Sequence, residues 1–232
     1  MGTQPIQFGD EGQVATRELL RRCDALAPLR LAGHTTFRGR LETLESIDKQ
    51  YGGGGVLALE DVSDLIATLH TQLAHWEAES ARRHLDAHAD IADIAIGVGL
   101  WAMRHRVEIT VVEPLANALA RRSNAARGRK ALGAVVALMH GVIAHVAPRL
   151  APDLERSNPE RAWRVLHVNL AITAIRTEDP ALIDAAFDAL DAALPAERSG
   201  FYAEAMALAL APKVAKEVRS RIEERHRKWT SL

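Results

Sequence analysis

The strongest constraint on the fold is the spacing of apolar residues, which recur every three or four positions along much of the chain. Two successive stripes illustrate it. The first comprises Val62, Leu65, Ile66, Leu69, Leu73 and Trp76, and the second comprises Ile91, Ile94, Ala95, Val98, Trp101 and Ala102. This period places apolar side chains on one face of an α-helix. The sequence therefore predicts amphipathic helices that pack against one another.

Strand signals are scarce by comparison. The one β-branched cluster, residues 107–112, has no partner run and is predicted to join two helices. Helix starts are clearly marked, for example by Pro180 directly after Asp179. We expect about nine or ten helices joined by short turns, which is typical of antiparallel helical hairpins.

One segment, residues 164–197, carries the pattern of a structural repeat. Its first helix has the small residue Ala171, its second has Phe187, and Pro195 closes it. These positions resemble the tetratricopeptide unit of about 34 residues. The resemblance implies an all-α fold in which antiparallel hairpins stack as a tetratricopeptide-like array. An irregular helical bundle is the alternative.

A second stretch resembles the same unit less closely. Gly99 is in the correct phase, but Ala95 stands where the family favours tryptophan and Ser123 stands where it favours proline. The segment between the two stretches is too long for the repeat. The resemblance thus covers about two units.

The glycine run at 52–55 predicts a domain boundary, because four successive glycines lose much backbone entropy in any regular element. We expect an N-terminal helical segment (1–51), a glycine hinge (52–55) and a main helical-repeat domain (56–232) that folds without the preceding part. The residues after the glycines are Val-Leu-Ala-Leu, which do not fit a phosphate-binding loop.

Composition excludes several classes of protein. Cys23 is the only cysteine, so no intramolecular disulfide can form, and the net charge of −1 gives no general attraction to nucleic acid. The N-terminus lacks the features of a signal peptide, and the apolar run 131–147 is shorter than a bilayer span. We expect a cytoplasmic protein with no membrane insertion.

A metal site is the first chemical hypothesis, because His84 and His88 lie four positions apart and would share a face of one helix. Two histidines are only half of a zinc site, which needs three or four protein ligands. Asp86 would lie on another side of the helix. The sequence therefore favours a polar helix start, with His84 and His88 as weak metal candidates and no cofactor expected.

Two charged stretches allow a partner contact. Arg121 and Arg122 belong to a basic turn that could bind an acidic partner, although it lacks the interleaved aromatic residues that favour single-stranded nucleic acid. The acidic stripe of Asp184, Asp188 and Asp191 is interpreted as a solvated helix face.

The function that fits these features is a non-catalytic scaffold or adaptor that binds another protein or a peptide. In a tetratricopeptide-like array the first helices of the hairpins line the binding surface, so Arg164, His167 and Asn169 are the candidate contacts, together with Arg121 and Arg122. The alternative is an all-α enzyme, or a binder of a small ligand or metal, that uses interior histidines.

Overall fold

Every regular element that the structure describes is a helix. The computed structural model describes residues 16–51, 60–151, 161–210 and 214–230. The elements are α1 (Thr16–Leu26), the short 3-10 helix η1 (Ala27–Leu29), α2 (His34–Tyr51), α3 (Glu60–Arg83), α4 (His88–Arg104), α5 (Glu113–Ala125), α6 (Arg129–Leu150), α7 (Ala162–Thr177), α8 (Pro180–Ala193), α9 (Arg198–Ala209) and α10 (Lys216–Thr230). The all-α prediction is confirmed. Residues 107–112 join α4 to α5 without forming a strand, as predicted.

The chain divides by its internal contacts into two compact units. Unit 1 is Met1–Arg121 and unit 2 is Arg122–Leu232. This division falls within α5, whereas the glycine run 52–55 lies outside the described residues. The hinge expected there stays a prediction.

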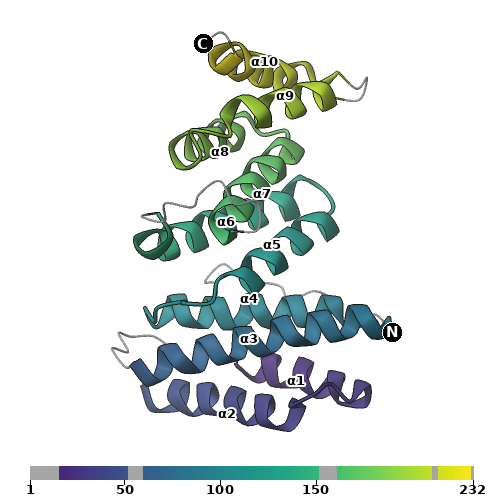
Figure 1. Ribbon diagram of the computed structural model, residues 1–232, viewed down its shortest axis with the longest axis vertical. Coiled ribbons are helices and arrows are strands. Elements are labelled where there is room, and N and C mark those ends of the chain that lie inside the picture. The colour runs from purple at the N-terminus through teal and green to yellow at the C-terminus, as the bar shows by residue number, and fades with distance from the viewer. Residues whose placement is uncertain (1–15, 52–59, 152–160, 211–213, 231–232) are drawn as a thin grey trace. The chain divides into compact units, whose positions relative to one another are not determined.

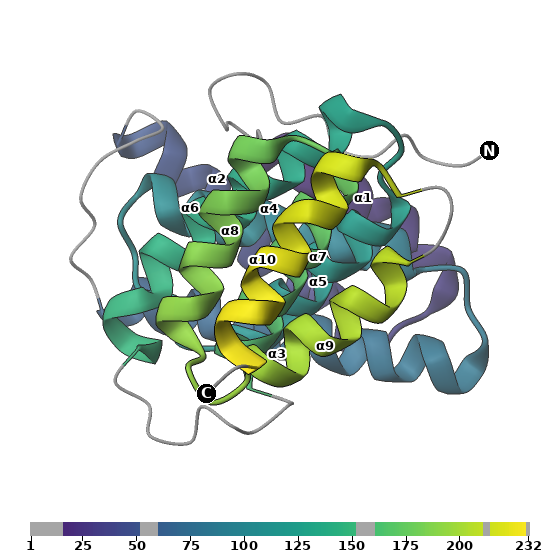
Figure 2. The same cartoon turned by 90° about the horizontal axis from the view of Figure 1, so that it is seen from above.

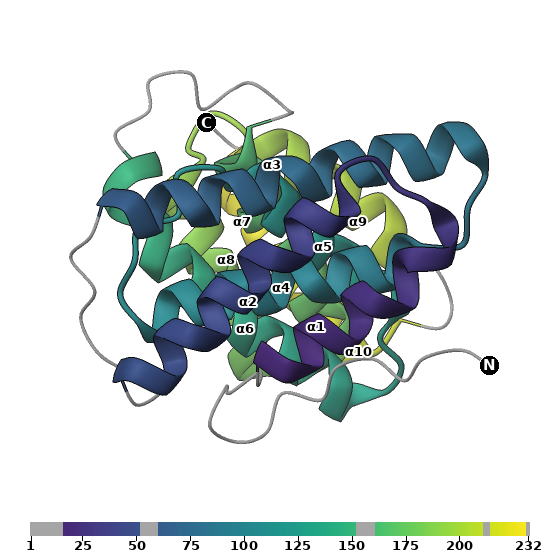
Figure 3. The ribbon, with the colours of Figure 1, turned by 90° about the horizontal axis from the view of Figure 1, so that it is seen from below.

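Unit 1 contains two helical hairpins that close on each other. α1 packs against α2 and α3 against α4, and further contacts join α1 to α4 and α2 to α3 (Figures 1 and 3). α1 and α4 approach each other closely at Gly97. A β-carbon added to Gly97 would lie only 2.3 Å from a methyl carbon of Leu19, so any larger residue here would force the Leu19 side chain to shift.

A buried polar centre fixes α2 against α4. The Asp48 carboxylate accepts hydrogen bonds from Trp101 Nε1 at 2.9 Å, from Arg104 at 2.9 Å and from His105 Nε2 at 2.8 Å. Trp101 and His105 are fully or almost fully buried. Because a carboxylate inside a protein must have such partners, Asp48 serves as a structural anchor of unit 1.

Unit 2 is a succession of neighbouring helices. α6 packs on α7, α7 on α8, and α10 contacts both α9 and α8, crossing over them in the view from above (Figure 2). The start of α8 follows the sequence prediction. Asp179 caps the helix by accepting from the N–H groups of Ala181 and Leu182, and Pro180 occupies a first-turn position where no backbone donor is needed.

The interpretation of the acidic stripe on α8 as a solvated face holds for only part of the stripe, because Asp188 is 70% exposed whereas Asp191 is buried. Arg221 of α10 pairs with Asp184, and Arg225 donates to Asp188 at 2.6 Å and to Asp191 at 2.7 Å. A helix distant in sequence therefore contacts the stripe, and the buried Asp191 ties α8 to α10.

One described helix, α6, is long and apolar enough to cross a membrane by length and composition alone. It extends several residues beyond the apolar run recognised in the sequence, so the length argument against a span does not apply to it. About a third of its most apolar window is buried, and α6 packs closely on α7.

Candidate functional site

The hairpin of α7 and α8 contains the residues that resemble a tetratricopeptide unit. On α7 the small residues Ala171 and Ala174 are fully buried, and on α8 Phe187 is fully buried as well. Pro195 follows the end of α8 and is exposed. Small side chains in the contact allow the two helices to pack closely, which is the role that the resemblance implies for them.

A cavity of about 350 Å³ opens at one end of this hairpin. Trp163 and His167 of α7 form its aromatic wall, and the other lining residues are small: Ala151, Ala189, Ala192 and Ala193. Its volume lies within the range of about 300–1,000 Å³ that is typical of small-molecule pockets. The cavity is apolar except for the two aromatic residues, which carry ring nitrogens.

The ring nitrogens of this wall are unsatisfied. Trp163 and His167 are 7% and 3% exposed, and their rings meet edge to face with centroids 4.4 Å apart. Neither His167 nitrogen nor Trp163 Nε1 has a hydrogen-bond partner in the described structure. Buried polar atoms nearly always have partners, so three unpaired nitrogens at one cavity are unusual.

The imidazole of His167 is electrically neutral at physiological pH. Burial, and to a smaller extent the neighbouring His140, lowers the pKa of His167 to about 4. A neutral imidazole offers one hydrogen-bond donor and one acceptor. No other titratable side chain lines the described part of the cavity, so the arrangement is suited to hydrogen-bonded recognition of an uncharged group.

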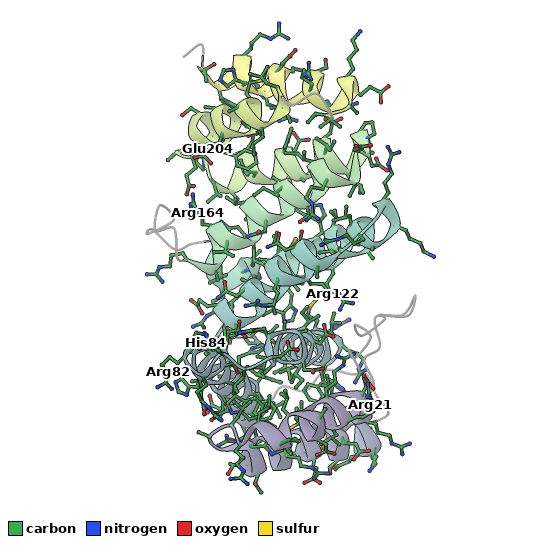
Figure 4. The ribbon with its side chains drawn as sticks, turned by 90° about the vertical axis from the view of Figure 1, so that its right-hand side faces the viewer. Arg21, Arg82, His84, Arg122, Arg164 and Glu204 are labelled. Atoms are coloured by element: carbon green, nitrogen blue, oxygen red, sulfur yellow. The ribbon has the colours of Figure 1, made fainter. Side chains whose placement is uncertain are left out.

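The three residues expected to form one polar surface on α7 have different surroundings. His167 is buried at the cavity. Arg164 is partly exposed, appears at the edge of unit 2 in Figure 4, and donates to Glu197 at 2.5 Å. Asn169 donates to the carbonyl of Val165 in its own helix. Only His167 therefore lines the cavity.

The basic turn is largely occupied by contacts within the chain. Within unit 1, Arg121 pairs with Glu77, and within unit 2, Arg129 pairs with Glu178. Arg122 is half-buried and has an interaction of its own. The turn offers fewer available cations than its sequence indicated, and its role as a partner contact stays a prediction.

His84 and His88 do not share a helix, so the geometric basis of the metal hypothesis is wrong. His84 is exposed in the turn after α3, with a left-handed φ of 53°, whereas His88 begins α4. His88 Nδ1 lies 2.9 Å from a Glu77 carboxylate oxygen. Figure 4 places His84 beside Arg82, on the side of unit 1 opposite to Arg21. No group of three potential metal ligands occurs among the described residues.

Sequence reasoning identified His167 but missed Trp163 and the cavity. The one sequence signal for the cavity was the group of alanines at the end of α8, in the stretch Asp-Ala-Ala-Leu-Pro-Ala. Alanine side chains are small and leave space beside large aromatic rings. Helical periodicity alone does not reveal which alanines face that space.

The fold and the site define a class: an all-α protein of helical hairpins with an aromatic, hydrogen-bonding cavity on one hairpin. Comparison with known proteins assigns the chain to no family. No family model, curated protein or solved structure matches the chain.

Proposed function

We propose that the chain is a non-catalytic scaffold of tetratricopeptide-like helical hairpins, and that the α7–α8 hairpin binds a segment of a partner protein. The observation that carries this proposal is the cavity beside Trp163 and His167, which lies on the first helix of the hairpin. A pocket of this size accepts one large side chain of a partner. Buried aromatic pockets of this kind supply much of the affinity in protein interfaces.

The resemblance to tetratricopeptide units supports the same proposal. Ala171, Ala174 and Phe187 are buried in the hairpin as such a unit requires. The closed contacts among α1, α2, α3 and α4 fit a helical bundle better than an open array. We therefore assign the repeat-like role to the α7–α8 hairpin.

A matched pair of variants on α8 tests the proposal. Ala192 and Ala185 are both exposed alanines, but only Ala192 lines the cavity. Ala192→Phe places a ring at the cavity, whereas Ala185→Phe adds the same ring elsewhere on the helix. Wild-type protein and both variants are used to capture partners from a lysate of the cells that contain the protein.

A partner retained by wild type and Ala185→Phe but lost by Ala192→Phe supports the scaffold. The circular dichroism and melting temperature of both variants must match wild type for the comparison to hold. If no partner is captured reproducibly, or if both variants retain every partner, the proposal is wrong. The alternative of a small-ligand binder then takes its place, since it relies on the same interior histidine.

A further inference from the structure

His167 differs from the other buried histidines of the described chain. His70 Nε2 contacts the carbonyl of Ala95 at 3.3 Å, and His105 Nε2 contacts Asp48, so each has one ring nitrogen without a partner. Both nitrogens of His167 are unpaired, and Trp163 next to it also has an unpaired Nε1. An unsatisfied buried polar group destabilises the folded chain. A ligand that pairs with these nitrogens would remove part of that destabilisation.

The wall of the cavity determines the chemistry of such a ligand. Neutral His167 supplies an acceptor as well as a donor, and Trp163 supplies a donor. A hydroxyl group can both donate and accept, so it complements the two rings, whose centroids are 4.4 Å apart. The remaining wall is alanine, which favours an apolar body. An apolar cavity of about 150 Å³ has room for benzene, so this larger and more open one has room for a substituted ring.

Charged groups fit this cavity poorly. The nearest candidate cation on α7, Arg164, is paired with Glu197. The second carboxylate oxygen of Glu197 is buried and unpartnered, which disfavours another anion nearby. An ammonium group would find no carboxylate among the residues that line the described cavity. An unpaired charge in such surroundings is costly.

We infer that the cavity binds an uncharged hydroxy-aromatic group, a phenol, whose hydroxyl donates to an imidazole nitrogen of His167 and accepts from the indole N–H of Trp163. The inference rests on the site of the proposed function and specifies what that site recognises. On a partner protein the group is a tyrosine side chain, and a free phenol shares its chemistry. Both contacts require the two rings to turn toward the cavity, because the ring nitrogens of His167 and Trp163 are shielded from solvent in the described structure.

Three small probes of similar shape test the chemistry on the full chain. p-Cresol has the ring and hydroxyl of tyrosine, toluene lacks the hydroxyl, and 4-methylbenzoate carries a charge. Binding is followed by the indole N–H signal of Trp163 in ¹⁵N–¹H spectra, which Trp163→Phe identifies among the four tryptophans. We expect p-cresol to bind about tenfold more tightly than toluene, the net effect of one or two hydrogen bonds. No perturbation by p-cresol, or equal affinity for all three probes, would overturn the inference.

Three single variants test whether p-cresol binds in this cavity and whether His167 recognises its hydroxyl. Ala192→Phe should abolish the p-cresol response, whereas Ala185→Phe should leave it unchanged. His167→Leu should reduce the preference for p-cresol over toluene to about twofold or less while toluene still binds. Because the leucine removes unpaired nitrogens, this variant should also melt at or above the wild-type temperature. A preference for p-cresol that survives His167→Leu would show that His167 is not the recognising group.

A capped pentapeptide with tyrosine at its centre and alanine at the other four positions distinguishes the two sources of the phenol. Tighter binding of the peptide than of p-cresol identifies a protein partner, and weaker binding identifies a free phenol. The outcomes also separate this inference from the scaffold proposal. If p-cresol binds but no captured partner depends on Ala192, the inference stands without the scaffold. If a partner depends on Ala192 but p-cresol does not bind, only the inference falls.

Discussion

Arg22 of α1 donates to the carboxylate of Asp90 on α4 at 2.9 Å, from a position that is only 1% exposed. Asp93 of α4 and Glu18 of α1 also pair with this guanidinium, at 2.9 Å and 3.0 Å. One buried cation is thus surrounded by three carboxylates. The arrangement joins α1 to α4, which lie on opposite sides of the glycine run in the sequence.

Replacing Arg22 should destabilise unit 1 strongly. Arg22→Met keeps much of the apolar stem but leaves the buried Asp93 carboxylate without its arginine, which typically costs about 3 to 5 kcal/mol. Arg21→Met provides the control, because the neighbouring Arg21 side chain is 58% exposed and solvent screens its pair with Glu18, so its loss should change stability little. Urea unfolding measures both. Equal effects of the two variants would contradict a central role of Arg22.

The same contacts make a specific prediction for the isolated segment 56–232. The sequence led us to expect that this segment folds alone, but the packing of α1 on α4 favours the opposite outcome for unit 1. Without α1, Asp93 loses its pair with Arg22, and Gly97 loses its close contact with Leu19. We expect backbone amides of α4 to exchange with deuterium much faster in the truncated protein, while those of α7 in unit 2 keep their protection. Unchanged protection of α4 would support the original boundary.

Local sequence signals predicted the local structure well. Helical spacing gave the all-α class, and Asp179 with Pro180 marked the start of α8. These features depend on residues within one or two helical turns, where spacing and capping chemistry act directly. The buried positions of Ala171 and Phe187 follow from the same periodicity.

Contacts between distant residues were not predictable in the same way. Nothing in the sequence of α8 indicates that Asp184 pairs with Arg221, 37 positions later. The sequence indicated a polar helix start near His84 and His88, but the turn contains neither glycine nor proline to mark that one helix ends before His84 and the next begins at His88. The cavity at His167 likewise depends on how three alanines of α8 face α7. Each of these features is set by tertiary packing.

Asp191 is predicted to be the polar centre that holds the C-terminal helix. Its carboxylate accepts from Tyr202 Oη at 2.9 Å, from Arg225 at 2.7 Å and from Trp229 Nε1 at 3.1 Å. Asp191→Ala should cost about 2 to 4 kcal/mol, because it leaves the buried Tyr202 hydroxyl and other donors unpaired. Asp188→Ala on the same helix should change stability by less than about 1 kcal/mol, since the Asp188 side chain is 70% exposed.

Thermal unfolding of both aspartate variants checks this prediction, with the indole signal of Trp229 as a local reporter. We expect Asp191→Ala to shift that signal toward the position of a solvated indole and to lower the melting temperature of unit 2. Asp188→Ala should do neither. If the two variants behave alike, α10 is held mainly by the apolar contacts of Val218 and Ile222.

The stability of the protein should fall as the pH is lowered from about 7 to about 4. Burial lowers the pKa of His70 and of His167 to about 4 in the folded chain, from an ordinary value of 6.5. Between those values the unfolded chain binds protons that the folded chain does not, so stability is fully present above about pH 6.5 and is lost toward pH 4. Each histidine contributes a slope of up to about 1.4 kcal/mol per pH unit in this window.

His167→Leu should therefore reduce the pH dependence of the free energy of unfolding between pH 7 and pH 5, where most carboxyl groups remain ionised. Because the two ring nitrogens of His167 have no partners, the variant loses no hydrogen bond at neutral pH, and its stability there should equal or exceed that of wild type. Urea unfolding at closely spaced pH values measures both effects. A wild-type stability that stays constant from pH 7 to pH 5, or a variant with the wild-type slope, would show that the imidazole of His167 is protonated as easily in the folded chain as in the unfolded one.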